Sequence, residues 1–171
     1  KEARGLLLEL KGSQLAFEAI GMDGNKIEST LKEISNQFGS LENMTVMNAV
    51  NIERFAQNAG VAGTEIVKFN KVMMDLTGSS FDVSTNMAKT AVNMAKSANV
   101  STSKVLSDMA SSANKFAEFS MQGAEGFAKA AVEAAKVGSS VNEILGAADK
   151  LLDFESSITA QFKAQVLTGK Q

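Results

Sequence analysis

Cysteine, histidine, proline, tryptophan and tyrosine are all absent from the 171 residues of this chain. Without cysteine there is no disulfide and no thiolate ligand. Without histidine as well, Ser-His-Asp and Cys-His catalysis and the usual zinc ligand sets are excluded. The absence of proline removes the strongest helix breaker. Together with abundant Ala, Met, Lys and Glu, this predicts an all-α protein built from long helices.

Charge of one sign is also lacking, because the formal net charge is −2 and both signs are mixed along the chain. No basic stripe is present, so direct nucleic-acid binding is not expected. The longest apolar runs, such as "GLLLEL", are far shorter than the ~20 residues of a membrane-spanning helix. The chain begins with Lys1 rather than Met, and we expect it to be a piece of a longer protein.

Candidate chemical sites are few and weak. The fragment "DGNKIE" lacks the alternating oxygen ligands of a calcium loop. Asp149, Asp153 and Glu155 cluster near the C-terminus, where a solvated helix face explains them better than paired catalytic acids. We therefore predict no catalytic, cofactor-binding or metal-ligating residue, no small-molecule substrate and no enzymatic activity.

The first 53 residues have apolar side chains at a seven-residue spacing in two phases, which is typical of the a and d positions of a coiled coil. Residues 1–53 are interpreted as a coiled-coil-like helical segment, with ordinary packing inside a helical bundle as the alternative. The pair of glycines in "GMDGN", residues 21–25, suggests a break in this segment. The predicted self-association seam comprises Leu6, Leu10, Phe17, Ile20, Ile27, Leu31, Ile34, Phe38 and Leu41.

Residues 54–171 are interpreted as helix-turn-helix repeats of about 39 residues. This length is the offset between two similar stretches of sequence, one containing Val61 and the other Val100. Each copy predicts a helix that ends at Gly60, Asn99 or Gly138, residue types that accept left-handed backbone angles. The third copy aligns best with one residue fewer before its turn. Ser101 is the expected N-cap after the second turn, and Ser140 with Glu143 forms an expected capping box after the third.

Apolar stripes at helical spacing predict the core of this second region. One stripe is formed by Ile144, Ala148, Leu151, Ile158 and Phe162. The residues expected to be largely buried are Val105, Met109, Phe116, Phe127, Leu151 and Phe162.

Residues 90–171 resemble the tail tape measure proteins of long-tailed bacteriophages. The phrases that carry the resemblance are "AKSANVSTSKVLSDMA", "FAKAAVEAAKVGSSVNEIL" and "LLDFESSITAQFKAQVLTGKQ". The resemblance implies a long helical structural protein that occupies the tail tube lumen, sets tail length during assembly and is released at genome ejection. It also implies self-association as a homo-oligomer such as a trimer, contacts with tail tube and tail tip or baseplate proteins, and transient contact with the host membrane. The expected location is the virion tail, and the host cytoplasm during assembly.

Two other classes of function remain open. The first is a helical protein-protein interaction or signalling module of the bacterial chemoreceptor-rod type, although glycine breaks oppose the continuous heptads of such a rod. The second is a membrane-active helical protein, although no continuous apolar hairpin is present.

Overall fold

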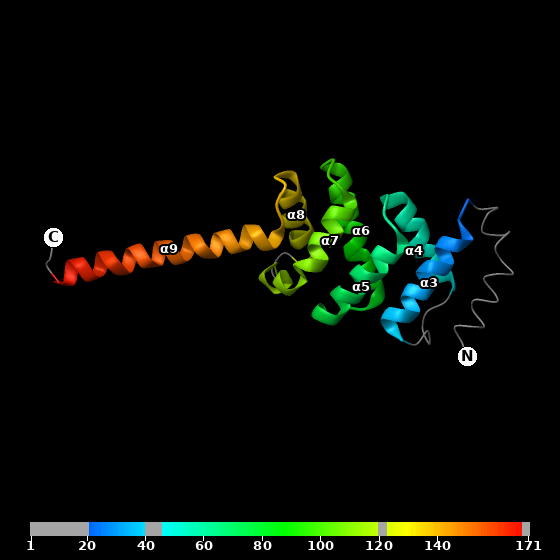
Figure 1. The fold of residues 1–171 in the computed structure, drawn as a ribbon, viewed down its shortest axis with the longest axis horizontal. Helices are drawn as coiled ribbons and strands as arrows, with labels where there is room; N and C mark the ends of the chain where they lie inside the picture. Colours follow the sequence, from blue (N-terminus) through cyan, green and yellow to red (C-terminus); the bar gives the residue numbers. More distant parts are fainter. Residues whose placement is uncertain (1–20, 40–45, 120–122, 169–171) are drawn as a thin grey trace.

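The computed structural model describes residues 21–39, 46–119 and 123–168, with side chains as far as residue 159. The predicted fold class is confirmed, because the described residues form helices and no strand (Figure 1). The helices are α3 (Gly24–Phe38), α4 (Val46–Ala59), α5 (Gly63–Thr77), α6 (Phe81–Ser97), α7 (Thr102–Ser111), the 3₁₀ helix η1 (Ala113–Phe119), α8 (Gly123–Lys136) and α9 (Val141–Thr168).

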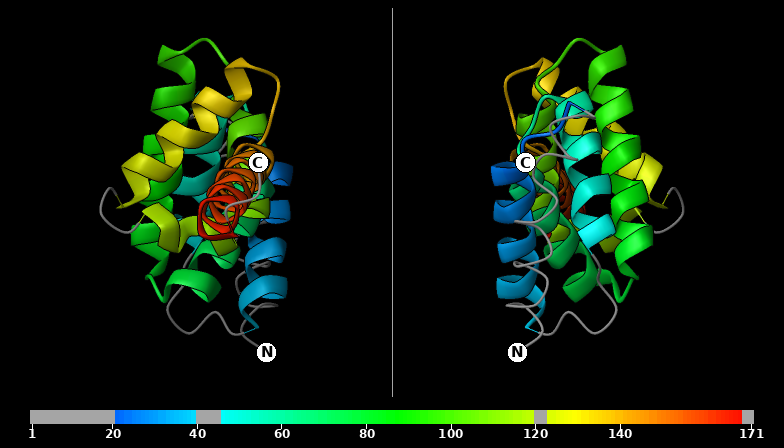
Figure 2. Two further views of the ribbon diagram at one scale, coloured as in Figure 1. Left: turned by 90° about the vertical axis from the view of Figure 1, so that its left-hand side faces the viewer. Right: turned by 90° about the vertical axis from the view of Figure 1, so that its right-hand side faces the viewer.

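The helices from α3 to α8 form one stacked body, from which α9 projects as a single long helix (Figure 1). Within the body, α5 packs against α3 on one side and against α7 on the other, while α6 packs against α8. Viewed along the long axis, α9 is seen end-on and overlaps the body from which it projects (Figure 2). The expected boundary between residues 53 and 54 lies within α4, which continues across it.

Three helices end in the same way, as the residue types predicted. Gly60, Asn99 and Gly138 have φ angles of 73°, 55° and 75°. After each of them, the next backbone N–H donates to a carbonyl five residues earlier: Val61 to Ala56 (3.0 Å), Val100 to Ala95 (3.0 Å) and Ser139 to Ala134 (2.9 Å). This is the Schellman pattern, which satisfies carbonyls left free by the last helical turn.

The spacing of these helix ends corrects one detail of the alignment of the three repeat copies that the sequence suggested. The donors Val61, Val100 and Ser139 are separated by 39 residues in both intervals, since 100 − 61 and 139 − 100 are equal. The expected loss of one residue in the third copy is wrong. That alignment matched the letters "AK" at residues 95–96 with those at 135–136, whereas the hydrogen bonds make Ala134 equivalent to Ala95.

Both expected helix caps are present. The Ser101 hydroxyl accepts a hydrogen bond from the Lys104 backbone N–H at 3.3 Å. Ser140 and Glu143 form the predicted capping box, in which Ser140 Oγ accepts from Glu143 N at 3.2 Å and the Glu143 carboxylate accepts from Ser140 N at 2.9 Å. Hydrogen bonds from the Ser139 hydroxyl and the Ser140 backbone lower the pKa of Glu143, so this cap weakens on acidification.

The core runs through the body from α3 to the first residue of α9. Among the residues expected to be buried, Val105, Met109 and Phe127 are fully enclosed, and Phe116 is partly buried against the core. The expectation for Leu151 is wrong, since its side chain is 68% exposed. The described residues 151–159 are all exposed, and α9 projects from the body as a single helix (Figure 1). The side chain of Phe162 lies outside the described residues.

The middle of the predicted self-association seam lies on α3. Ile27, Leu31 and Ile34 are buried where α3 packs against α4 and α5 of the same chain. Phe38 is partly buried, with its ring edge-on to Phe81 at 5.6 Å between centroids. Packing within one chain therefore accounts for these four residues, and self-association through them stays a prediction. The remaining five, Leu6, Leu10, Phe17, Ile20 and Leu41, lie outside the described residues.

A close polar contact joins α3, α4 and the start of α5. The buried Thr30 hydroxyl donates to the buried Glu53 carboxylate. Both side chains press against Gly63, where a Cβ atom would come within 3.0 Å of Glu53 Oε1 and Thr30 Oγ1. Glycine is therefore needed at position 63 because the side chains of Thr30 and Glu53 leave no room for a Cβ atom, and not because of a left-handed turn.

Gly63→Ala is expected to destabilise the body by ~1–3 kcal/mol, because overpacking a closed site displaces its neighbours. The matched control is Gly146→Ala on α9, where an added Cβ meets no atom within 4 Å. That variant should be stabilised by up to ~1 kcal/mol through helix propensity. Thermal melts followed by circular dichroism measure both, and equal melting temperatures for the two variants would contradict the close contact at Gly63.

Candidate interaction surface

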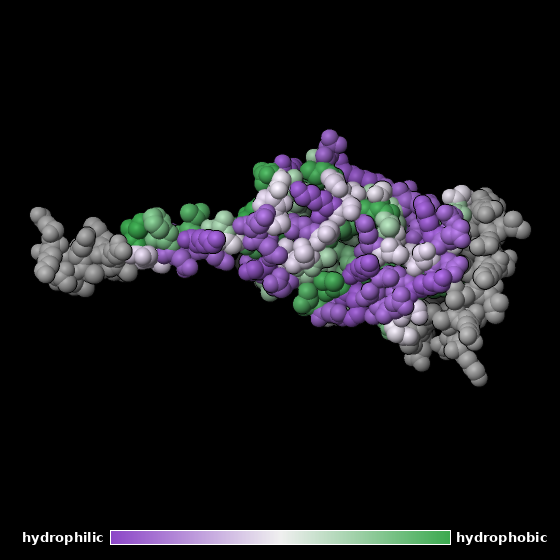
Figure 3. All heavy atoms as spheres, viewed as in Figure 1, coloured by the Kyte–Doolittle hydropathy of each residue, from purple (hydrophilic) through white to green (hydrophobic). Residues whose placement is uncertain are grey.

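Exposed apolar side chains gather on α9. Nine large apolar residues of the described part are exposed, and five of them lie on this helix: Ile144, Leu151, Leu152, Phe154 and Ile158. In the space-filling view, green apolar residues follow one edge of the projecting helix and purple hydrophilic residues follow the other (Figure 3). Such a contiguous apolar surface marks an interaction site more often than scattered single residues do.

The spacing of these residues is that of a coiled coil. Ile144, Leu151 and Ile158 are seven residues apart, and Ala148, Glu155 and Phe162 form the second phase, four residues after each of them. The two phases together place one residue of the stripe on every turn of the helix. We call residues 144, 148, 151, 155 and 158 the α9 stripe.

Apart from Glu155, the charged residues in the middle of α9 lie away from this stripe. Asp149, Lys150 and Asp153 occupy positions on the opposite side of the helical wheel. Leu152 and Phe154 occupy the two flanks and widen the apolar face. Glu155 is the one charged residue within the α9 stripe.

The first turn of α9 is anchored to the body by a buried carboxylate. Asp108 of α7 accepts hydrogen bonds from the Val141 backbone N–H at 3.0 Å (Oδ2) and 3.2 Å (Oδ1). The Ser112 hydroxyl donates to the same side chain at 3.2 Å. A carboxylate is favourable at a helix N-terminus, where free N–H groups and the helix dipole meet it. Asp108 therefore fixes where α9 begins.

A second feature is a groove of about 590 Å³ between the start of α3 and the turn from α4 to α5. Its titratable lining residues are Lys26 and Glu53. Glu53 is 4% exposed and accepts a hydrogen bond from Thr30, so its carboxylate is already used in holding α3 to α4. The groove is therefore a solvent-filled hollow beside a contact that holds two helices together.

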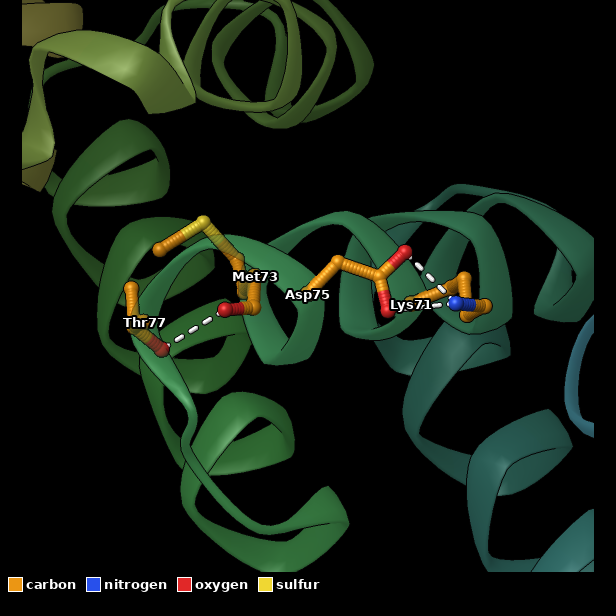
Figure 4. Close-up of polar contacts among 4 residues, drawn as sticks. All are labelled: Lys71, Met73, Asp75 and Thr77. Atoms are coloured by element: carbon orange, nitrogen blue, oxygen red, sulfur yellow. Dashed lines mark hydrogen bonds and ion pairs between the residues drawn. The ribbon is translucent and has the colours of Figure 1, made fainter.

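Four ion pairs among the described residues each lie within a single helix. Lys71 and Asp75 of α5 pair across one helical turn, and the Thr77 hydroxyl closes the next turn by donating to the Met73 carbonyl at 2.6 Å (Figure 4). The other three pairs also join residues three or four positions apart. Exposed pairs of this kind contribute little to stability and bring no charges together from different helices.

Within the part of the chain that the structure describes, no three acidic, histidine or cysteine side chains are placed to share a metal ion. The same residues include no helix with the length and hydropathy needed to cross a membrane.

The sequence predicted an apolar stripe of Ile144, Ala148, Leu151, Ile158 and Phe162, without Glu155, but assigned it to the core. It missed the anchor at Asp108, which joins residues 33 positions apart and leaves no local signal. Comparison with known proteins does not identify the chain. No family model, curated protein or solved structure matches it.

Proposed function

We propose that this chain is part of a bacteriophage tail tape measure protein, a structural protein that sets tail length during assembly. The observation that carries the proposal is the recurrence of one helix end, with the same hydrogen bonds, at intervals of 39 residues. A protein that measures length needs repeated units of fixed size, and stacked helical repeats supply them. The sequence resemblance over residues 90–171 supports the same role.

In this proposal the chain occupies the tail tube lumen, contacts the tube and the tail tip or baseplate, and leaves at genome ejection. The chemistry of the described residues supports a structural role, because the buried polar groups Glu53 and Asp108 hold helices together. The alternative of a chemoreceptor-like rod is less well supported. Its helices would continue unbroken, whereas here they end at Gly60, Gly78 and Gly138.

The test is a deletion of residues 62–100 in the full-length protein, followed by electron microscopy of the assembled tails. Val61 and Val100 occupy equivalent places in two Schellman turns, so Val61 joined to Ser101 preserves both the turn and the next helix cap. The deletion removes α5 and α6, which pack side by side. Their combined length along the stack is therefore at most that of the longer helix.

We expect tails shortened by up to ~26 Å, the length of the 17-residue helix α6 at ~1.5 Å per residue. A shortening near ~59 Å would show that the 39 residues lie in the tube as one extended helix. Duplication of residues 62–100 is the matched control and should lengthen tails by the same amount. Tails of unchanged length and normal yield would contradict the measuring role.

A further inference from the structure

One buried position is polar in the helix pair α5–α6 and apolar in the pairs on either side, α3–α4 and α7–α8. Adding 39 residues relates Leu31 of α3 to Asn70 of α5 and to Met109 of α7. Leu31 is 2% exposed, and neither Asn70 nor Met109 has any exposed surface. The core thus contains a side-chain amide at a place where its two equivalents are apolar.

The hydrogen-bond partner of Asn70 is also polar only in this pair of helices. Asn70 Nδ2 donates to the Thr85 hydroxyl of α6 at 2.7 Å. The equivalents of Thr85 are Val46 of α4 and Ala124 of α8, and neither side chain can form a hydrogen bond. Both members of the contact therefore change together from one repeat to the next, from apolar to polar and back to apolar.

The buried amide is only partly satisfied. No group among the described residues donates to Asn70 Oδ1, although this atom is buried. A buried acceptor without a donor loses the hydrogen bonds that water gave it, and this loss is as large as or larger than the net gain from one neutral hydrogen bond. An apolar pair such as Leu31 and Val46 carries no such cost. Stability alone therefore does not explain the polar pair.

The neighbours of α5 indicate a different use for the pair. α5 packs against both α4 and α6, which are equivalent helices of successive repeats. At the equivalent position, only Thr85 of α6 can accept a hydrogen bond from Asn70. If α5 took the place of α7 beside α8, Asn70 would lie opposite Ala124 with neither end of its amide paired. A buried polar residue disfavours such alternatives because each of them leaves it without a partner.

We propose that Asn70 and Thr85 form a specificity device, which holds α5 against α6 of its own repeat and excludes packing in which equivalent helices exchange places. Arrays of similar repeats need such a device, because their helices present similar apolar faces and misassembly is their characteristic failure. The device lowers the stability of the correct arrangement but lowers that of the wrong ones further. The inference concerns the folding of the chain and does not rest on the proposed function.

The test replaces the polar pair with the residues of the first repeat, as Asn70→Leu with Thr85→Val. The double variant should melt at the wild-type temperature or up to ~8 °C above it, because the unpaired buried acceptor is gone. In amide NMR spectra, the wild type should give one set of signals for α5 and α6. The double variant should give two or more sets, since arrangements that the polar pair excluded become populated.

Two further variants serve as controls. Thr85→Val alone leaves Asn70 buried without any partner, and its melting temperature should be lower than that of the wild type by ~2–8 °C. Met109→Leu exchanges one apolar residue for another at the equivalent position of α7, and it should keep a single set of amide signals. The first control shows that the contact forms in solution, and the second shows that a change in the core does not by itself multiply the signals.

A double variant that melts below the wild type would overturn the inference, because the pair would then be an ordinary stabilising contact. A double variant that is at least as stable as the wild type but keeps one set of signals would also overturn it, since no alternative packing would need to be excluded. Extra signals in Met109→Leu would have the same consequence. An unchanged melting temperature in Thr85→Val would show that the hydrogen bond between Asn70 and Thr85 does not form.

Discussion

Ile27→Asp combined with Ile34→Asp is expected to abolish cooperative unfolding of the helical body. Both side chains have no exposed surface and lie where α3 packs against α4 and α5. An unpaired carboxylate buried at either position costs several kcal/mol, since the charge loses its hydration and gains no partner. Two such costs together approach the whole stability of a typical domain, ~5–15 kcal/mol. Circular dichroism melts should show no sharp transition.

The control is Ile27→Val with Ile34→Val, which keeps both positions apolar and should cost only ~0.5–1.5 kcal/mol per site. Light scattering on the same samples separates folding from association. If the Asp variant melts like the wild type but changes its mass, these side chains face another copy rather than their own core. The packing described for α3 would then be wrong.

The helical fold class and the helix ends were predictable because local chemistry determines them. Gly60, Asn99 and Gly138 accept positive φ angles, and Ser140 with Glu143 supplies both halves of a capping box. Each of these signals lies within a few residues of the backbone group that it satisfies. Neither packing partners nor distant contacts are needed to recognise them.

Local sequence could not predict what covers each apolar helix face. Ile27, Leu31 and Ile34 have a spacing that fits both a heptad of 3.5 residues per turn and an ordinary helix of 3.6. The structure shows that their own chain covers them. Leu151 and Ile158 have the same spacing, yet they are exposed because α9 leaves the body after its first turns.

The position of α9 depends on contacts that are distant in sequence. Asp108 anchors Val141, and Asn142 Nδ2 donates to the Ser111 carbonyl at 3.3 Å. A buried aspartate in a helix gives no sequence signal that separates it from an exposed one. The sequence therefore predicted the apolar spacing on α9 but wrongly predicted Leu151 to be buried, because its exposure depends on the tertiary structure.

Phe127→Ala is expected to lower the free energy of unfolding by ~3–5 kcal/mol, the usual cost of emptying a fully enclosed phenylalanine site. Phe127 on α8 has no exposed surface. Its ring lies edge-on to Phe116 with centroids 5.5 Å apart and tilted to Phe119 with centroids 5.3 Å apart. For a chain of this length the loss corresponds to a melting temperature lower by ~6–20 °C.

Phe116→Ala is the matched comparison, because it removes the same ring from a partly buried position on η1. It should cost less than ~3 kcal/mol, since part of its surface is already in contact with water. The double variant should cost less than the sum of the two single variants by ~0.5–1.5 kcal/mol, the range measured for aromatic pairs. Chemical denaturation of the four proteins measures this coupling. If the two single variants lost the same free energy of unfolding and showed no coupling, the described packing of η1 on α8 would be contradicted. Phe127 would then not be the ring that holds η1 in place.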